Sequence, residues 1–184
     1  MKKGFRTVLL RSACLVLLAG CASAGGSQSR DLDLKELCTE EQVFQYADFE
    51  WGTDSEQLFK QSSLKFDEKD LGQGDESSTK TYESKEKFSL ENAESNMDLE
   101  FSDGQLSQVS FTFDIEQDAN TWIQKEVDEL NSLYGGGIAT GLGNQIYQWQ
   151  GEQDTVLQLT AFTEGDESAT VILSVASMEY SIGS

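Results

Sequence analysis

Residues 97–115 read MDLEFSDGQLSQVSFTFDI, and the pattern of this stretch indicates what kind of sheet the chain builds. Apolar residues alternate with polar ones on both sides of a short turn: Met97, Leu99 and Phe101 before it, then Val109, Phe111 and Phe113. Alternation with period two is typical of strands that bury one face. Asp103-Gly104 favours a type I′ turn, because both central residues of that turn need positive φ. The stretch predicts an antiparallel hairpin with one wet face.

Similar patterns occur on either side of this hairpin. Upstream, Phe49 and Trp51 alternate with Glu50 as in a half-buried strand, Thr53-Asp-Ser-Glu56 resembles a capping box that begins a short helix, and residues 80–88 predict a strand. Downstream, residues 119–134 predict a longer amphipathic helix that Gly135 stops, and residues 145–150, 155–163 and 169–178 predict three more strands. Residues 31–46 fit no pattern clearly.

These elements predict an α+β domain over residues 31–184. We expect an antiparallel sheet with two helices on one face, which two α-β-β-β repeats at residues 47–114 and 115–178 could build.

The composition narrows the range of functions. The chain has 184 residues, with 33 acids against 13 bases, no histidine and no proline, and a net charge of −20. Without histidine, Ser-His-Asp and Cys-His catalysis within the chain are excluded. An acidic surface repels the phosphate backbone, so nucleic acid is not an expected partner. Hydrophobic residues make up 38% of the chain, which is enough to build a packed core.

The first 20 residues have the pattern of an export signal. Lys2, Lys3 and Arg6 precede a short apolar run over residues 12–19, and Leu18-Ala-Gly-Cys21 follows. These four residues resemble the lipobox of bacterial lipoproteins. The resemblance implies that a diacylglyceryl group is attached to the Cys21 thiol, that a peptidase cuts before it, and that Cys21 anchors the chain to the cell membrane or the outer membrane, facing the extracytoplasmic side.

Processing at Cys21 changes the chain that remains. Removal of the signal leaves nine bases against 33 acids, a net charge of −24. Residues 21–30 are small and polar, and we expect them to act as a flexible tether. Cys14 leaves with the signal and Cys21 is acylated, so Cys38 has no partner for an internal disulfide. The acidic neighbours of Cys38 would raise the pKa of its thiol, so we expect a small, partly buried residue and not a reactive thiol.

The body of the chain also resembles known domains in a few places. Phe49-Glu-Trp-Gly-Thr-Asp-Ser-Glu56 and Phe101-Ser-Asp-Gly-Gln-Leu106 are similar to patterns in small secreted bacterial α+β domains. Those domains include outer-membrane assembly lipoproteins of the SmpA/BamE kind and tandem-repeat beta-lactamase inhibitor proteins. This chain lacks the proline that often follows the first helix there. The likeness spans about half the chain and implies a fold only.

Few residues stand out as a binding or catalytic site. Trp149, with Tyr147 two positions before it, predicts either an exposed aromatic strip for a ligand or, more commonly, a core position. The acidic groups could hold calcium, but none has the EF-hand spacing. The glycine-rich residues 135–143 follow a helix instead of opening one and have no Gly-Lys-Ser/Thr, so a linker is favoured over a phosphate loop. We predict no catalytic residue, no cofactor and no metal.

Three hypotheses follow for the function. The first is a non-catalytic, lipid-anchored extracytoplasmic domain that binds another protein or an envelope component through its sheet face or its loops. The second is an envelope enzyme or a small-ligand or calcium-binding lipoprotein that uses carboxylates. The third is a surface-coat or spacer lipoprotein with no specific partner.

Overall fold

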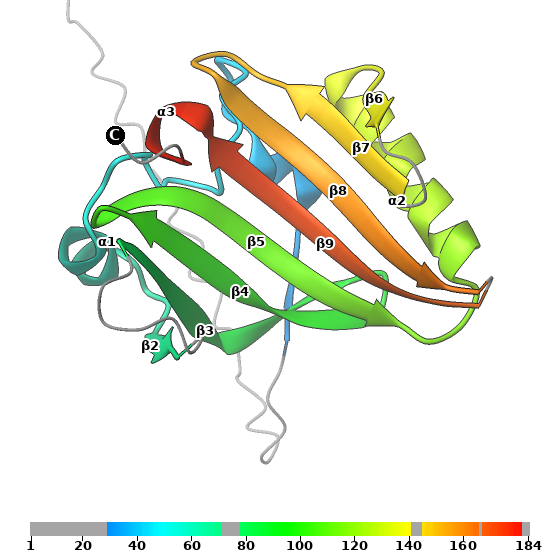
Figure 1. Ribbon diagram of the computed structural model, residues 1–184, viewed down its shortest axis with the longest axis horizontal. Coiled ribbons are helices and arrows are strands. Elements are labelled where there is room, and N and C mark those ends of the chain that lie inside the picture. Colours follow the sequence, from blue (N-terminus) through cyan, green and yellow to red (C-terminus); the bar gives the residue numbers. More distant parts are fainter. Residues whose placement is uncertain (1–28, 71–77, 141–144, 166, 182–184) are drawn as a thin grey trace, which may run out of the picture.

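The computed structural model describes residues 29–70, 78–140, 145–165 and 167–181. Nine strands in these ranges form one mixed sheet in the order β1-β3-β4-β5-β9-β8-β7-β6, and β2 also pairs with β3 (Figure 1). Their bounds are β1 (Arg30–Asp31), β2 (Phe66–Lys69), β3 (Thr79–Leu90), β4 (Ala93–Ser102), β5 (Gln105–Ile115), β6 (Ile138–Thr140), β7 (Gln145–Gln150), β8 (Thr155–Glu164) and β9 (Ser168–Ser177). All neighbouring strands are antiparallel except β1 and β3.

The predicted hairpin is present as β4 and β5. Leu99 pairs with Val109 and Met97 with Phe111. The turn residues Asp103 and Gly104 have φ values of 51° and 80°, which are the positive values that the turn type requires. The strands expected over residues 80–88, 145–150, 155–163 and 169–178 are also confirmed as β3, β7, β8 and β9.

The expected fold class is wrong, because one large mixed sheet dominates the fold and helices make up only a small part of the described residues. In the described residues the helices are α1 (Ser55–Gln61), α2 (Ala119–Tyr134) and α3 (Met178–Ser181), with a 3-10 turn η1 (Leu34–Leu37). Only α2 is long, and it packs on β8 and β9. Counted outward from the β5–β9 pair, each half of the sheet runs through three consecutive strands, β5-β4-β3 and β9-β8-β7. The helices do not follow this symmetry.

Helix α1 is too small to cover a sheet. It has seven residues, with Leu58 buried and Phe59 partly buried, and it lies at the end of the sheet in Figure 1. Its N-cap is Asp54, which accepts a hydrogen bond from the Gln57 backbone amide at 2.9 Å. The predicted capping box at Thr53 is therefore displaced by one residue.

Residues 32–51 cover the part of the sheet that α1 does not reach. This segment is mostly irregular, and the strand expected at Phe49 and Trp51 is absent. It nevertheless buries seven large apolar side chains: Leu32, Leu34, Leu37, Val43, Phe44, Tyr46 and Phe49. The Tyr46 ring contacts Phe88 and Phe111 edge to face, with ring centroids 6.1 and 5.7 Å apart. Burial of these side chains stabilises the segment in place of regular hydrogen bonding.

Contacts also join this segment to the C-terminal half of the sheet. The Phe44 amide donates to the Thr155 hydroxyl at 2.9 Å, and the Phe44 ring meets Tyr134 of α2 edge to face at 5.2 Å. The Tyr134 hydroxyl donates to the Leu34 carbonyl. One continuous apolar core therefore lies between the sheet and a layer made of residues 32–51 and α2.

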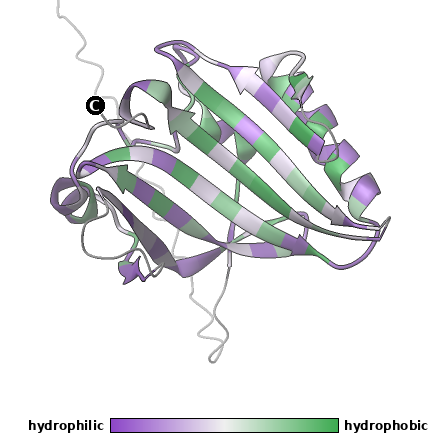
Figure 2. Ribbon diagram, in the orientation of Figure 1, coloured by the Kyte–Doolittle hydropathy of each residue, from purple (hydrophilic) through white to green (hydrophobic). Residues whose placement is uncertain are grey.

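Figure 2 shows that apolar and polar residues alternate along the central strands. The apolar set points to the core, which leaves the opposite face of the sheet to the polar set. Across the part of the chain that the structure describes, no helix has both the length and the apolar character required to cross a bilayer.

Candidate functional site

The face of the sheet that points away from the core is turned toward the viewer in Figure 1. We call it the outer face. Phe162 lies on this face, outside three rows of residues that strand register aligns across the sheet. The rows are Ser110-Ser174-Gln158-Gln148-Ile138, Thr112-Ile172-Thr160-Ile146 and Gln108-Ala176-Val156-Gln150. These rows run across β5, β9, β8, β7 and, at Ile138, β6. In the middle of the sheet, no described element lies over them.

The outer face carries no charged side chain in those rows. Asp114 and Glu164 are the charged residues of β5–β9. Asp114 stands in register with Thr170 and Phe162, one row beyond the three rows, and Glu164 lies at the end of β8. Ile138 and Phe162 are 60% and 44% exposed, and they are two of the three exposed large hydrophobic residues among those described. The chain has a net charge of −20, so a broad face without charged side chains differs markedly from the chain as a whole.

Charges begin abruptly at the β4 side of this face. Lys69 of β2 forms ion pairs with Glu83 at 2.9 Å and Asp98 at 3.0 Å, which neutralises part of the negative charge there. Glu100 pairs in register with Gln108, and its backbone carbonyl accepts a hydrogen bond from the Ser107 hydroxyl at 3.1 Å. Partial burial raises the pKa of the Glu100 carboxyl. Glu100 therefore marks the edge of the uncharged surface.

The structure places Trp149 and Tyr147 on the core side of β7, away from the outer face. Trp149 is 3% exposed, and its indole N–H donates to the Asn131 side-chain oxygen at 3.1 Å and to the Gly135 carbonyl at 2.9 Å. A Cβ at Gly137 would lie 2.6 Å from the Trp149 ring. Tyr147 packs partly buried against the core. A ligand role for this pair stays a prediction, and it would require residues 135–137 to move.

The other predicted positions divide between described and undescribed residues. Cys21, the signal and most of the tether lie outside the described residues. Cys38 is free and partly buried, and burial raises the pKa of its thiol, so the thiolate form is disfavoured.

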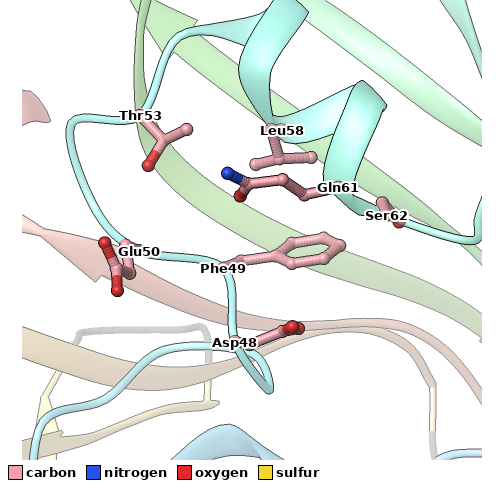
Figure 3. A pocket seen from close by; sticks show the side chains of 7 residues that line it. All are labelled: Asp48, Phe49, Glu50, Thr53, Leu58, Gln61 and Ser62. Atoms are coloured by element: carbon pink, nitrogen blue, oxygen red, sulfur yellow. The ribbon is translucent and has the colours of Figure 1, made fainter.

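A small cavity lies between α1 and the loop before it (Figure 3). The Phe49 and Leu58 side chains and the Gln61 amide line it together with four more residues: Asp48, Glu50, Thr53 and Ser62. Its volume of about 20 Å³ is room for one water molecule and no larger ligand. We assign no binding function to it.

An acidic cleft of about 340 Å³ lies beside α2, with Asp31, Asp33, Glu91 and Glu129 on its walls. Nearby on α2, Glu126 is 1% exposed, and neither of its carboxyl oxygens has a hydrogen-bond partner. Burial, followed by repulsion from Glu129 and Glu91, raises the pKa of Glu126 to about 7. No three Asp, Glu or Cys residues of the described ranges are grouped so that they could hold a metal ion. The calcium hypothesis gains no support from this cleft.

The outer face could not be predicted from the apolar residues of each strand, because those residues indicate only the side that is buried. The signal was present in their neighbours: residues 105–113, 145–150, 155–163 and 168–177 contain no charge at all. Alternation places half of these uncharged residues on the side opposite the core.

Comparison with known proteins adds no relative to this picture. No protein-family model, no curated protein and no solved structure matches the chain.

Proposed function

We propose that this protein is a lipid-anchored, extracytoplasmic protein of the bacterial cell envelope that works by binding another protein through its outer face, without catalysis. Two parts of the chain support the proposal. The lipobox-like Leu18-Ala-Gly-Cys21 is the proposed anchor, and the outer face is the proposed surface to which a partner binds.

The uncharged character of the outer face is the observation that carries the proposal. Centres of protein interfaces are depleted in charged residues, because each charge buried there has to be desolvated. The mature chain has 33 acids, yet the three rows of the outer face hold none of them. Isoleucines at positions 138, 146 and 172, with Phe162, add apolar area between the polar residues. A face that only had to stay in water would have no need of this composition.

The anchor has a direct test in the Cys21→Ser variant. Each buried methylene of an acyl chain contributes about 0.8 kcal/mol, and two or three chains give lasting attachment. We expect the wild-type chain in the membrane fraction with a diacylglyceryl mass at Cys21, and the variant without that lipid mass. An unmodified Cys21 in the native product, or a Cys21→Ser chain that a mild salt wash leaves on membranes with its signal removed, would refute the lipid anchor.

The binding surface is tested by site-specific photocrosslinking in intact cells. A photoreactive residue replaces Gln158 on the outer face or Gln124, which is exposed on α2. We expect one dominant protein adduct from position 158 and none of that mass from position 124. Equal adducts from both positions, or none from position 158, would argue against the outer face as the binding surface.

Calorimetry with calcium addresses the alternative that relies on carboxylates. We expect no saturable heat when calcium is titrated into the purified chain. A saturable heat that Glu129→Gln or Glu91→Gln removes would favour the calcium-binding hypothesis instead.

A further inference from the structure

We infer that the partner on the outer face is a second copy of this chain, packed sheet against sheet. The inference rests on the proposed function, since it takes the outer face as the binding surface. It adds the identity of the occupant, which the charge pattern and the apolar residues favour, while the size of the face limits how tightly two copies bind.

Charge is the first argument. In a two-fold symmetric dimer both copies use the same patch, so an acid near the symmetry axis lies close to the same acid of the other chain. Two chains of net charge −24 repel each other over most of their surfaces. The rows across β5, β9, β8 and β7 bring no charge to the contact. The outer face is therefore the described surface on which two copies can meet at the least electrostatic cost.

The distribution of exposed apolar residues points to the same face. Phe162 on β8 and Ile138 on β6 are 44% and 60% exposed, and Ile172 lies on β9, the strand next to β8 on its other side. The row that begins at Ser110 contains two serines and two glutamines before Ile138, and these polar side chains can donate and accept hydrogen bonds across an interface. A self-complementary surface needs this combination, because each donor must find an acceptor on an identical face.

The size of the face predicts a weak dimer. The outer face spans five strands about 4.8 Å apart over about seven residues of strand length, with a rise of about 3.3 Å per residue, which makes a flat area of about 500 Å² at most because β6 has three residues. A standard interface buries about 800 Å² on each partner, so we expect a dissociation constant in the micromolar range. Anchoring of both copies in one membrane raises their effective concentration, which makes such an affinity sufficient.

Sedimentation equilibrium of the full mature chain in density-matched detergent tests the inference. We expect a monomer–dimer equilibrium that tightens as salt is raised from about 50 to about 500 mM, because salt screens the repulsion between two acidic bodies. Attraction to a basic partner would instead weaken with salt. A chain that stays monomeric at all concentrations, or a dimer that weakens with salt, would overturn the inference.

Two variants with the same change in charge locate the contact. Ser174→Lys introduces a charge at the centre of the outer face, and Gln124→Lys introduces the same charge on the exposed side of α2. We expect Ser174→Lys to weaken the dimer by about tenfold or more, because the lysine has no partner when it is desolvated. Gln124→Lys should leave the dimer unchanged or slightly tighter. Equal weakening by both would overturn the inference, and circular dichroism establishes that both variants fold.

The photocrosslinking experiment separates this inference from the proposed function. An adduct of this chain with itself from position 158 supports both. An adduct with a different protein overturns the second-copy inference and leaves the proposed function standing. The absence of any adduct from position 158 counts against both.

Discussion

The two faces of the same strands differ in what covers them, although both lack charge over the middle of β5, β9, β8 and β7. On the inner face, large side chains such as Phe111, Phe113 and Leu173 are buried under α2 and residues 32–51. On the outer face, small polar residues and a few isoleucines remain partly exposed, with no covering layer among the described residues. Burial accounts for the absence of charge on the inner face. On the outer face the same absence needs another explanation, and we attribute it to a binding partner.

The largest expected difference between the faces is in stability. Phe111→Ala removes a fully buried ring that contacts Tyr46 and Phe88, and it should lower the free energy of unfolding by about 3–5 kcal/mol. Thr112→Ala changes the next residue of β5, on the outer face, and should cost under about 1 kcal/mol. Denaturant unfolding measures both. Similar losses from the two variants would contradict the assignment of inner and outer faces.

Glu126 is the exception on the inner side, since it is the buried charged residue of the described chain. Its pKa rises from 4.5 when unfolded to about 7 when folded. Between these values the folded chain keeps a proton that the unfolded chain has released, so stability falls as pH rises through this window, by about 3 kcal/mol in all. The Glu126→Gln variant should lose this pH dependence and be more stable than wild type at pH 8.

The control for this prediction is Glu116→Gln, which removes an exposed acid just before α2. It should keep the wild-type pH dependence, measured as the free energy of unfolding between pH 4.5 and 8. Wild-type protein whose stability rises through this window would show that Glu126 is not a buried, unpartnered acid.

A smaller effect is expected where α2 meets residues 32–51. Tyr134→Phe removes the hydrogen bond from the Tyr134 hydroxyl to the Leu34 carbonyl, and should cost about 1 kcal/mol. Tyr147→Phe is the matched change on β7, where the hydroxyl has no hydrogen bond among the described residues, and should be close to neutral. Thermal unfolding of both variants checks the difference. Equal costs would mean that this hydrogen bond does not hold the two parts of the covering layer together.

The smallest expected change in stability is on the outer face itself. Ser174→Lys should alter the free energy of unfolding of the monomer by under about 0.5 kcal/mol, because the lysine can extend into water there. Unfolding at concentrations below the dimer range measures this. A loss of several kcal/mol would show that Ser174 is packed in the monomer and is not part of a free surface.

The strands and α2 could be predicted from the sequence because their signals are local. Alternation over residues 97–115 and helical spacing over residues 119–134 appear within one element. The turn at Asp103-Gly104 was equally local. These features set the sheet and its hairpins.

The covering segment could not be predicted in the same way. Apolar residues over residues 32–51 follow no period, because each of them fits a particular site on the sheet. Tyr46 is buried by Phe88 and Phe111, which lie far along the chain. The short helix expected after Thr53 is confirmed as α1, in which Leu58 and Phe59 supply the apolar contacts. Strand β6 was missed because it follows three glycines, which favour a linker.

The candidate site was only partly visible in the sequence. The absence of charge in residues 168–177 is visible in the sequence. The sequence does not show which side of the sheet the helix and the covering segment occupy. Trp149 stood out by residue type, and the structure buries it. A lipid anchor at Cys21 stays a prediction, which depends on a local sequence motif outside the described residues.

Accessibility of the outer face on living cells is the most direct measurement. A membrane-impermeant maleimide is applied to cells carrying Ser174→Cys or Gln124→Cys, and peptide mass spectrometry gives the labelling rate at each position. If a partner covers the outer face, Ser174→Cys should react slowly on cells and several-fold faster once the protein is solubilised and diluted, while Gln124→Cys reacts equally in both states. The same rate for Ser174→Cys on cells and after dilution would contradict a covered outer face.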